Sequence, residues 1–201
     1  MRYLPHLFEN NRAWAASQIR TDARFFDRLC EIQKPDYLWI GCSDSRVPAN
    51  EVVGLAPGEL FVHRNVGNVV PAGDLNVLSV LQYAVDTLGV KHVIVCGHYS
   101  CGGVAAAMSG TLPNPLNQWI AHIRRVAAEH ERELSALPDD ASRVNRLCEL
   151  NVRAQVKGVC ATETIQNAWA RAEPVTVHGW IYDLKDGLLR DLDVSVSGSH
   201  S

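Results

Sequence analysis

The sequence predicts an α/β fold in which a mainly parallel central β-sheet is flanked by helices. Two observations lead to this prediction. Short apolar runs set off by glycine or proline alternate along the chain with longer segments of helical periodicity. The 201 residues, 47% of them hydrophobic, are enough for one substantial core and few for two. We therefore expect a single domain over residues 1–201, with an N-terminal helical arm at 1–34 and an α/β core at 35–201.

The expected elements follow one another in a regular order. Residues from about 8 to 32 carry an irregular apolar stripe typical of a helix. Buried strands are expected at 37–41, 60–64 and 92–97. Helices are expected at 75–88, opened by Asp74 and ended by Gly89, then from about 101, and over about 115–134 and 143–170. The segment from 174 to 196 indicates an antiparallel pair of strands around a turn at 185–187.

Composition excludes several classes of protein. The formal net charge of −3 gives no support to a general nucleic-acid or membrane-surface role. The first residues hold no apolar stretch of signal-peptide length, and no uncharged run is long enough to span a bilayer, so the expected location is the cytoplasm. A reducing compartment keeps thiols free, and the six cysteines therefore call for metal binding, catalysis or burial as their explanation.

Three residues that follow two predicted strands form a candidate metal site. Cys42 ends one strand, while His98 and Cys101 lie where another strand passes into a helix. Sites in parallel sheets gather beyond the carboxyl ends of strands, and two thiolates with one imidazole suit zinc and leave a fourth position open. Two alternatives remain at this point. The cysteines could be small buried hydrophobic residues, or the "GHYSCGG" corner could cradle an anion, although it lacks the Lys-Ser/Thr ending of a phosphate-binding loop.

Asp44 and Arg46 lie close enough to this site to act in it. If residues 42–46 remain extended, alternate side chains project to one side, and Asp44 points at the metal with Arg46 as its partner. The carboxylate could then occupy the fourth position, or it could be held away by the guanidinium and orient an attacking water. The alternative is an ordinary surface ion pair, which contributes little.

These residues, in this order, resemble the β-class carbonic anhydrases. The resemblance rests on "CSDSR" at 42–46, "GELFVHRNVGNVV" at 58–70, residues 79–103 and "VHGWIYDLKDGLL" at 177–189. It implies reversible hydration of carbon dioxide on one Zn²⁺ per subunit, held by Cys42, His98 and Cys101, with Asp44 and Arg46 as the catalytic pair. It also implies homodimers or dimers of dimers, in which the N-terminal helical arm packs on a partner subunit.

Further residues are expected to line the substrate pocket. Gln33 and Tyr83 match positions that line the active cleft in this family, and Val66 and Gly67 in "RNVGN" are additional candidates. A solvent-facing helix residue, a core aromatic and turn residues are the respective alternatives. The remaining cysteines and His63, His92 and His178 are interpreted as structural, because they lack a ligand-like spacing.

A narrower resemblance concerns regulation. "VPANEVVGLAPGELFVHRN" and "GWIYD" are similar to a bacterial subgroup in which Asp44 can bind zinc and close the site. In that subgroup a non-catalytic bicarbonate pocket uses residues that match Trp39, Arg64 and Tyr182. Their indole donor, planar cationic fork and hydroxyl suit a planar anion. We therefore expect inhibition by bicarbonate and by low pH.

Two other functions stay open on the sequence alone. The same zinc site could hydrolyse carbonyl sulfide or carbon disulfide, with pocket access deciding the substrate. Alternatively, the protein could be a non-catalytic zinc scaffold or bicarbonate sensor whose site stays closed. The presence of both Asp44 and Arg46 argues against the scaffold, since a purely structural zinc has no use for them.

Overall fold

The computed structural model describes residues 3–31 and 33–198. The chain divides into two compact units, Met1–Lys34 and Pro35–Ser201, which are described separately. The first unit holds α1 (Pro5–Thr21) and α2 (Phe25–Glu31), so the single helix expected over about 8–32 is wrong. The break follows from Asp22, which adopts an extended backbone and accepts a hydrogen bond on Oδ1 from the backbone N–H of Arg24. The end of the expected helix, residue 32, lies outside the described residues.

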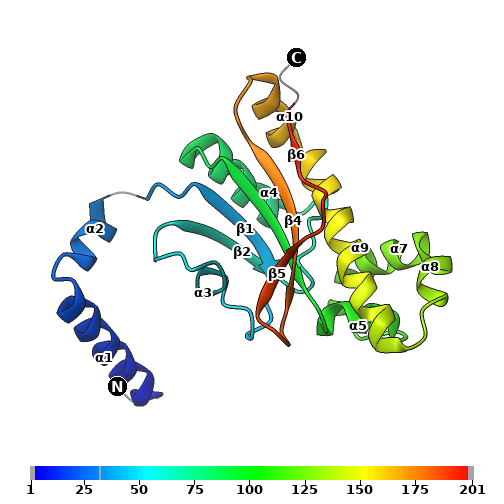
Figure 1. Cartoon of the computed structure of the whole chain (residues 1–201), viewed down its shortest axis with the longest axis horizontal. Coiled ribbons are helices and arrows are strands. Elements are labelled where there is room, and N and C mark those ends of the chain that lie inside the picture. The colour runs from blue at the N-terminus through cyan, green and yellow to red at the C-terminus, as the bar shows by residue number, and fades with distance from the viewer. Residues whose placement is uncertain (1–2, 32, 199–201) are drawn as a thin grey trace. The chain divides into compact units, whose positions relative to one another are not determined.

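The second unit is built on a six-stranded sheet of order β2-β1-β3-β4-β5, with β6 paired to β4 (Figure 1). The strands are β1 (Tyr37–Cys42), β2 (Leu60–Asn65), β3 (His92–His98), β4 (Thr176–Asp183), β5 (Leu188–Asp191) and β6 (Val196–Ser197). The first four are parallel to one another, and β5 and β6 run antiparallel to β4. The predicted fold class, a mainly parallel sheet flanked by helices, is confirmed.

The helices of this unit are shorter than the sequence pattern indicated. They are α3 (Ala49–Val53), α4 (Leu75–Gln82), η1 (Tyr83–Leu88), α5 (Gly102–Met108), α6 (Leu116–Trp119), α7 (Ala121–Glu129), α8 (Glu131–Ser135), α9 (Asp140–Cys160) and α10 (Glu163–Ala170). The helix expected at 115–134 is thus three short ones, and that at 143–170 is two. Thr162 starts α10 by accepting a hydrogen bond from the N–H of Ile165. None of the described helices is both long and apolar enough to cross a membrane.

Asp74 and Gly89 bound α4 and η1 as expected. The Asp74 side chain accepts a hydrogen bond from the N–H of Asn76, and Gly89 ends the segment with a left-handed backbone. The last six residues, Tyr83–Leu88, are wound as a π-helix rather than an α-helix. This change in winding is not visible in the apolar periodicity.

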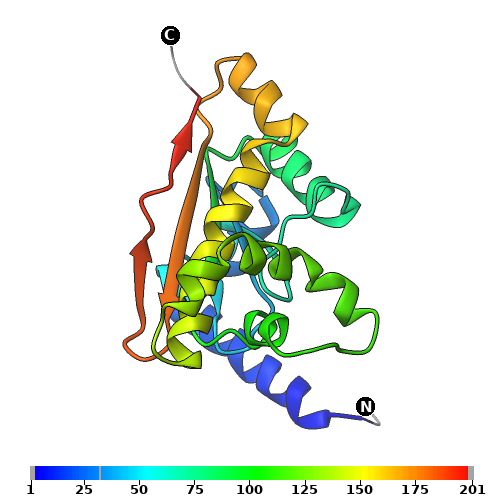
Figure 2. The ribbon, with the colours of Figure 1, turned by 90° about the vertical axis from the view of Figure 1, so that its right-hand side faces the viewer.

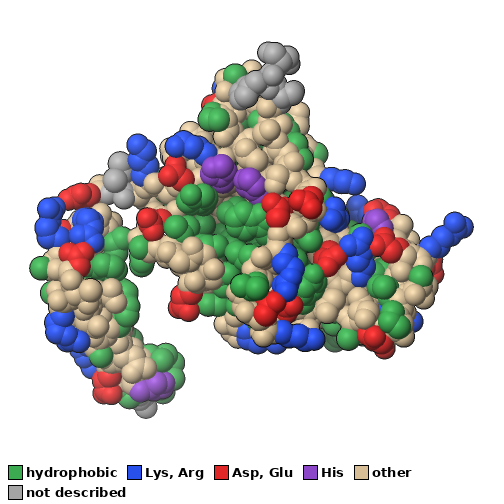
Figure 3. Space-filling model, in the orientation of Figure 1, with side chains coloured by type: hydrophobic (Ala, Val, Ile, Leu, Met, Phe, Trp, Pro, Cys, Tyr) green, Lys and Arg blue, Asp and Glu red, His purple; other side chains and the backbone are tan. Residues whose placement is uncertain are grey.

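The two faces of the sheet are covered unequally. On one face, apolar side chains of the sheet pack against α4, α5, α7, α9 and α10, and Figure 2 shows α9 lying along the strands. On the other face, Trp39, Leu60 and Ile94 form a smaller cluster, in which α3 and its flanking residues are joined by side chains of β4 and β5. Hydrophobic side chains therefore gather at the centre of the face seen in Figure 3. Val62 on β2 is 37% exposed there. A surface of this kind is typical of an interaction site.

The position of the site follows from the strand register. β1 and β3 are adjacent and parallel, with Gly41 opposite Cys96. Their carboxyl ends therefore meet at one edge of the sheet. As a result Cys42, which ends β1, lies next to His98, which ends β3.

Candidate metal centre

Cys42, His98 and Cys101 converge at the carboxyl ends of β1 and β3. The candidate ligand atoms of the three side chains all lie within 4.8 Å of one another, and all three residues are buried. Cys101 is the N-cap residue of α5, so the turn from β3 into this helix brings its side chain back toward His98. Among the described residues this is the one group of His, Cys, Asp and Glu side chains with the geometry to hold a metal ion.

The donor set fits zinc. Two sulfurs bound to a tetrahedral zinc ion at about 2.3 Å stand roughly 3.8 Å apart, and the Sγ atoms of Cys42 and Cys101 are 3.7 Å apart. His98 Nδ1 lies 3.0 Å from the carbonyl oxygen of Tyr99, which can only accept, so Nδ1 carries the proton. His98 Nε2 is then a bare lone pair, and it is buried without a hydrogen-bond partner in the described structure. A buried lone pair without a protein donor, placed beside two thiols, fits the role of a metal ligand.

The two thiols share one hydrogen bond. The hydrogen bond with the Cys101 thiol is the first cause that lowers the pKa of the Cys42 thiol, the nearby His98 ring and the backbone N–H groups of Gly67 and Asp44 add to it, and burial opposes them. The same contact with Cys42, together with burial, raises the pKa of Cys101. Ionising one thiol of this pair makes ionisation of the other harder, and a cation of charge +2 favours both as thiolates.

Asp44 lies beside this cluster and is fixed by Arg46. Arg46 Nε donates to Asp44 Oδ1 at 2.9 Å and its Nη2 to Oδ2 at 2.7 Å. These two bonds, ahead of the one from the Arg46 backbone N–H, hold the pKa of Asp44 well below its usual range. Asp44 Oδ2 is also 3.6 Å from His98 Nε2. In this structure the carboxylate faces the cluster while paired to the guanidinium.

The backbone that produces this pair differs from the expected one. Residues 42–46 do not remain extended, because the chain turns after Asp44 and the N–H of Val47 bonds to the Asp44 carbonyl. Asp44 Oδ1 accepts the N–H of Arg46 inside this turn. The expected ion pair therefore forms through a local turn rather than by strand alternation.

Trp39, Arg64 and Tyr182 come from three strands and lie on the less covered face of the sheet. Trp39 is buried in the cluster on this face, and Tyr182 packs against that cluster. Arg64 donates from Nε to the carbonyl of Cys42 at 2.7 Å and from Nη2 to the carbonyl of Asp44. The guanidinium thus holds the backbone of the segment that carries Asp44.

Val66 and Gly67 form a wall of the centre. A Cβ atom on Gly103, two residues after Cys101, would lie 2.8 Å from Val66 Cγ1. Gly67 has a positive φ of 77° and its N–H donates to Cys42. Asn151 Nδ2, from α9, donates to the Gly67 carbonyl at 2.8 Å and fixes the loop.

Tyr83 lies away from the centre of its own chain. The Tyr83 ring lies beside that of Phe61 at a tilt of 38°, with ring centroids 5.9 Å apart. Phe61 is in register with Leu38, four residues before Cys42 on β1, a separation of roughly 13 Å at the rise of a strand. Gln33 belongs to the first unit, Met1–Lys34.

Several contacts of this region were not anticipated from the sequence. The sequence did not indicate that His92 and His178 are in contact, with His92 Nδ1 3.1 Å from His178 Nε2 across β3 and β4. The partners of the ligands, the Tyr99 carbonyl and the Gly67 N–H, are backbone groups that carry no residue-type signal. Cys96, Cys148 and Cys160 are at least half-buried, as expected, whereas Cys30 is exposed.

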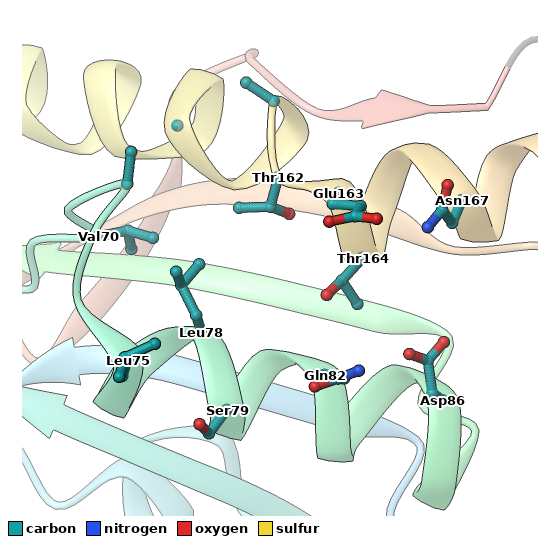
Figure 4. Close-up of a pocket in the computed structure, with 13 residues that line it drawn as sticks. Val70, Leu75, Leu78, Ser79, Gln82, Asp86, Thr162, Glu163, Thr164 and Asn167 are labelled. Atoms are coloured by element: carbon teal, nitrogen blue, oxygen red, sulfur yellow. The ribbon is translucent and has the colours of Figure 1, made fainter.

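A separate cavity of about 550 Å³ lies between α4–η1 and the junction of α9 with α10 (Figure 4). Figure 4 shows Gln82 and Asp86 on one side and Glu163 and Asn167 on the other. None of the three cluster residues lines it. This cavity is not part of the metal centre.

Comparisons with known proteins agree with this geometry. The family model described as "Carbonic anhydrase" matches residues 37–189. A carbonic anhydrase of Emericella nidulans is 53% identical over 192 residues, covering 96% of this chain and 84% of that protein. A Candida albicans carbonic anhydrase is 35% identical and covers 93% of this chain and 67% of its own length.

Solved structures give the same result. One of two tetrameric β-carbonic anhydrases from Sordaria macrospora superposes with a TM-score of 0.91 at 39% identity, covering 95% of this chain and 97% of that one. The Coccomyxa β-carbonic anhydrase in complex with acetazolamide superposes with a TM-score of 0.93 at 41% identity, covering 98% and 90%. The matches extend over the whole α/β core and the strands that carry the cluster. The chain therefore belongs to the β-carbonic anhydrase family and is a carbonic anhydrase.

Proposed function

We propose that this enzyme interconverts carbon dioxide and bicarbonate with one zinc ion per subunit, held by Cys42, His98 and Cys101. The observation that carries the proposal is the buried convergence of these three side chains within 4.8 Å. Zinc, when bound there, acts as a Lewis acid that acidifies water and makes it a nucleophile at neutral pH. The name shared by the relatives favours carbon dioxide over carbonyl sulfide and carbon disulfide as the substrate.

Asp44 and Arg46 have distinct roles in this proposal. Two thiolates cancel the formal charge of zinc, so the water is acidified less than on a site with three neutral ligands. Asp44 accepts a hydrogen bond from the nucleophile and orients it toward the carbon atom of the substrate. Arg46 fixes the rotamer of Asp44 and keeps it ionised through its two side-chain bonds. Val66 and Gly67 form the apolar wall against which carbon dioxide lies.

We further propose that Gln33 and Tyr83 complete the substrate pocket of a partner subunit in a homodimer or a dimer of dimers. The roughly 13 Å that separates the Tyr83 contact from Cys42 along β1 supports this assignment. No described residue of α1 or α2 is buried, so the apolar side chains of the arm need a partner surface. The tetrameric relatives of Sordaria macrospora are consistent with such an assembly. All six cysteines are unpaired, which suits the proposed cytoplasmic location.

Regulation of the kind found in the bacterial subgroup is also proposed. Under this proposal, bicarbonate binds at Trp39, Arg64 and Tyr182 and draws the Arg64 guanidinium toward itself. The carbonyls of Cys42 and Asp44 then lose their donors, which frees Asp44 to leave Arg46 and bind the metal. Low pH acts in the same direction, because protonation of the nucleophile leaves a water that Asp44 can displace.

The regulatory proposal is tested by inhibition of the zinc enzyme with added bicarbonate. Tyr182→Phe removes one proposed donor and should weaken inhibition several-fold with zinc content unchanged. Tyr37→Phe, on β1 outside the proposed pocket, serves as the matched control. Equal inhibition of all three proteins would refute the pocket and leave the catalytic proposal intact.

The catalytic proposal is tested by stopped-flow hydration assays together with metal analysis. Cys42→Ala should lose both zinc and activity, whereas Cys96→Ala, which removes a buried thiol that bonds only the Gly97 carbonyl, should keep both. Asp44→Asn should keep zinc but lose about 100-fold or more in kcat/KM, the range expected for a positioned acid–base group. Full activity in Cys42→Ala, or in Asp44→Asn, would contradict the assigned roles.

A further inference from the structure

Catalysis at the proposed site produces a proton that must leave the protein in every cycle. Each hydration converts one carbon dioxide and one water into bicarbonate and one proton. Asp44 is a poor acceptor for that proton, because both of its carboxylate oxygens already accept hydrogen bonds from the Arg46 guanidinium. Neither nitrogen of the His98 ring is available to accept the proton, because Nδ1 is bonded to the Tyr99 carbonyl and Nε2 faces the cluster. A separate base is therefore needed to accept the proton, a need that rests on the proposed function.

A cavity of about 800 Å³ begins at the wall of the centre. Val66 lines it together with residues of the 113–122 segment, including Trp119 and His122. His122 is the one side chain among these lining residues that titrates near neutral pH. The volume is enough for a chain of water molecules, each occupying about 30 Å³. Asn114 and Gln118 provide polar partners for such water along the lining.

The cavity and the metal centre share a single layer of residues. Trp119 Nε1 donates to the Val66 carbonyl at 2.8 Å. A Cβ atom on Gly67 would lie 2.6 Å from Ile123 Cδ1, so the residue after His122 packs directly on Gly67. The Gly67 N–H in turn donates to Cys42. His122 lies between Trp119 and Ile123 in sequence and is therefore held against this wall from the cavity side.

We propose that His122 is the group that carries protons between the metal centre and solvent, through water in the cavity beside Val66. One ring nitrogen of His122 accepts the proton released by the reacting water through the water chain. The other ring nitrogen releases a proton to a buffer base in solvent, and the ring returns to its neutral form. In the dehydration direction the same transfers run in reverse.

Burial and the charged groups around His122 together lower the pKa of its imidazole. Burial is the first cause that lowers its pKa, and the positive charge of Arg125 on α7 adds to this. Asp74, which caps α4, acts in the opposite direction and raises the pKa. A half-buried imidazole with a lowered pKa releases its proton readily to solvent buffers at neutral pH.

The test compares His122→Ala with His130→Ala in the zinc-loaded enzyme. His130 follows the end of the same helix, α7, and pairs with Glu133 at 3.3 Å, so it is a matched surface histidine away from the cavity. In dilute buffer, His122→Ala should lower kcat by about 10-fold or more while kcat/KM stays within about two-fold. Imidazole added to the assay should restore kcat, because it replaces the missing base. His130→Ala should change neither constant.

A second readout does not depend on turnover. In the zinc protein the His122 ring signal, assigned by its absence in His122→Ala, should titrate in NMR spectra between pH 5 and 8. An invariant signal over this range would overturn the proposal, as would an unchanged kcat in dilute buffer. A parallel loss of kcat and kcat/KM that imidazole does not restore would also overturn it and indicate a structural role. Absence of hydration by the wild-type enzyme would instead refute the proposed function.

Discussion

At the scale of single residues, the centre depends on backbone groups as much as on its side-chain ligands. The Tyr99 carbonyl fixes the tautomer of His98, and the Gly67 N–H donates to Cys42. The Arg64 guanidinium holds the carbonyls on either side of Ser43. Such contacts position a metal ligand within the narrow tolerance that catalysis needs. Substitutions near the ligands should therefore disturb the centre by shifting the backbone groups that position them.

Gly67→Ala tests this dependence. Gly67 has a φ of 77°, and a Cβ atom there would lie 2.6 Å from Ile123 Cδ1. A non-glycine residue in this conformation costs about 1–3 kcal/mol, so the free energy of unfolding should fall by that amount. Gly73→Ala is the matched control, because no atom lies within 4 Å of its Cβ position. Chemical denaturation of both variants measures the difference, and equal stability would contradict the strain assigned to Gly67.

The candidate ligands were accessible to sequence reasoning because each is tied to the end of a recognisable strand. Cys42 and His98 follow apolar runs that form β1 and β3, and the parallel pairing brings their ends together. The surroundings of the ligands could not be predicted in the same way. The bond from Arg64 of β2 to the Asp44 carbonyl and the packing of Trp119 on Val66 are tertiary contacts between distant segments.

At the scale of elements, strands were easier to predict than helix boundaries. The apolar runs of β1, β2 and β3 are bounded by glycine, proline or charge, and their limits agree with expectation within one residue. The helices from α6 to α8 break at Ile120 and His130, where no glycine or proline marks the sequence. These ends are set by how the segment packs on α5 and α9, which periodicity does not report.

The pairing of β3 with β4 brings two imidazoles into contact, which predicts a pH-dependent stability. Burial, followed by the charge of His92, lowers the pKa of His178 in the folded state, while Asp191 opposes this. The unfolded chain then binds more protons, so His178 contributes stability above a pH of about 6.5 that is lost as the pH falls. Among the described residues, the hydrogen-bond partner of His178 Nδ1 is Ser195 Oγ, a neutral group.

The variant His178→Gln isolates this effect. The thermal midpoint of the wild-type zinc enzyme should fall more than that of His178→Gln between pH 7.5 and pH 5.5, since the metal centre titrates equally in both proteins. Differential scanning calorimetry at the two pH values measures the difference. A larger acid loss in the variant would contradict the sign of the argument.

At the scale of the whole molecule, one face of the sheet keeps apolar side chains partly exposed. A single α/β unit gives no reason for this exposure. Within the second unit, α3 is the one described helix that packs on Trp39, Leu60 and Ile94, and Val62 remains 37% exposed on β2. β2 is also an edge strand of the sheet. A second copy of the chain would satisfy both features, in agreement with the proposed assembly.

Val62→Lys tests the role of this face. Burying an unpaired ammonium group costs several kcal/mol, so the variant should dissociate at concentrations at least 10-fold higher than the wild type. Ser135→Lys, on the exposed side of α8, is the matched control and should leave the assembly unchanged. Analytical ultracentrifugation measures both against the 22.1 kDa protomer. A wild-type protein that stays at the protomer mass would contradict the proposed assembly.

The central claim is that one zinc ion joins the ends of β1 and β3 through Cys42, His98 and Cys101. X-ray absorption at the zinc edge of the purified enzyme tests it most directly. The account predicts one zinc per chain with two sulfur neighbours at about 2.3 Å and nitrogen at about 2.0–2.1 Å. A first shell without sulfur, or a stoichiometry far below one, would contradict it.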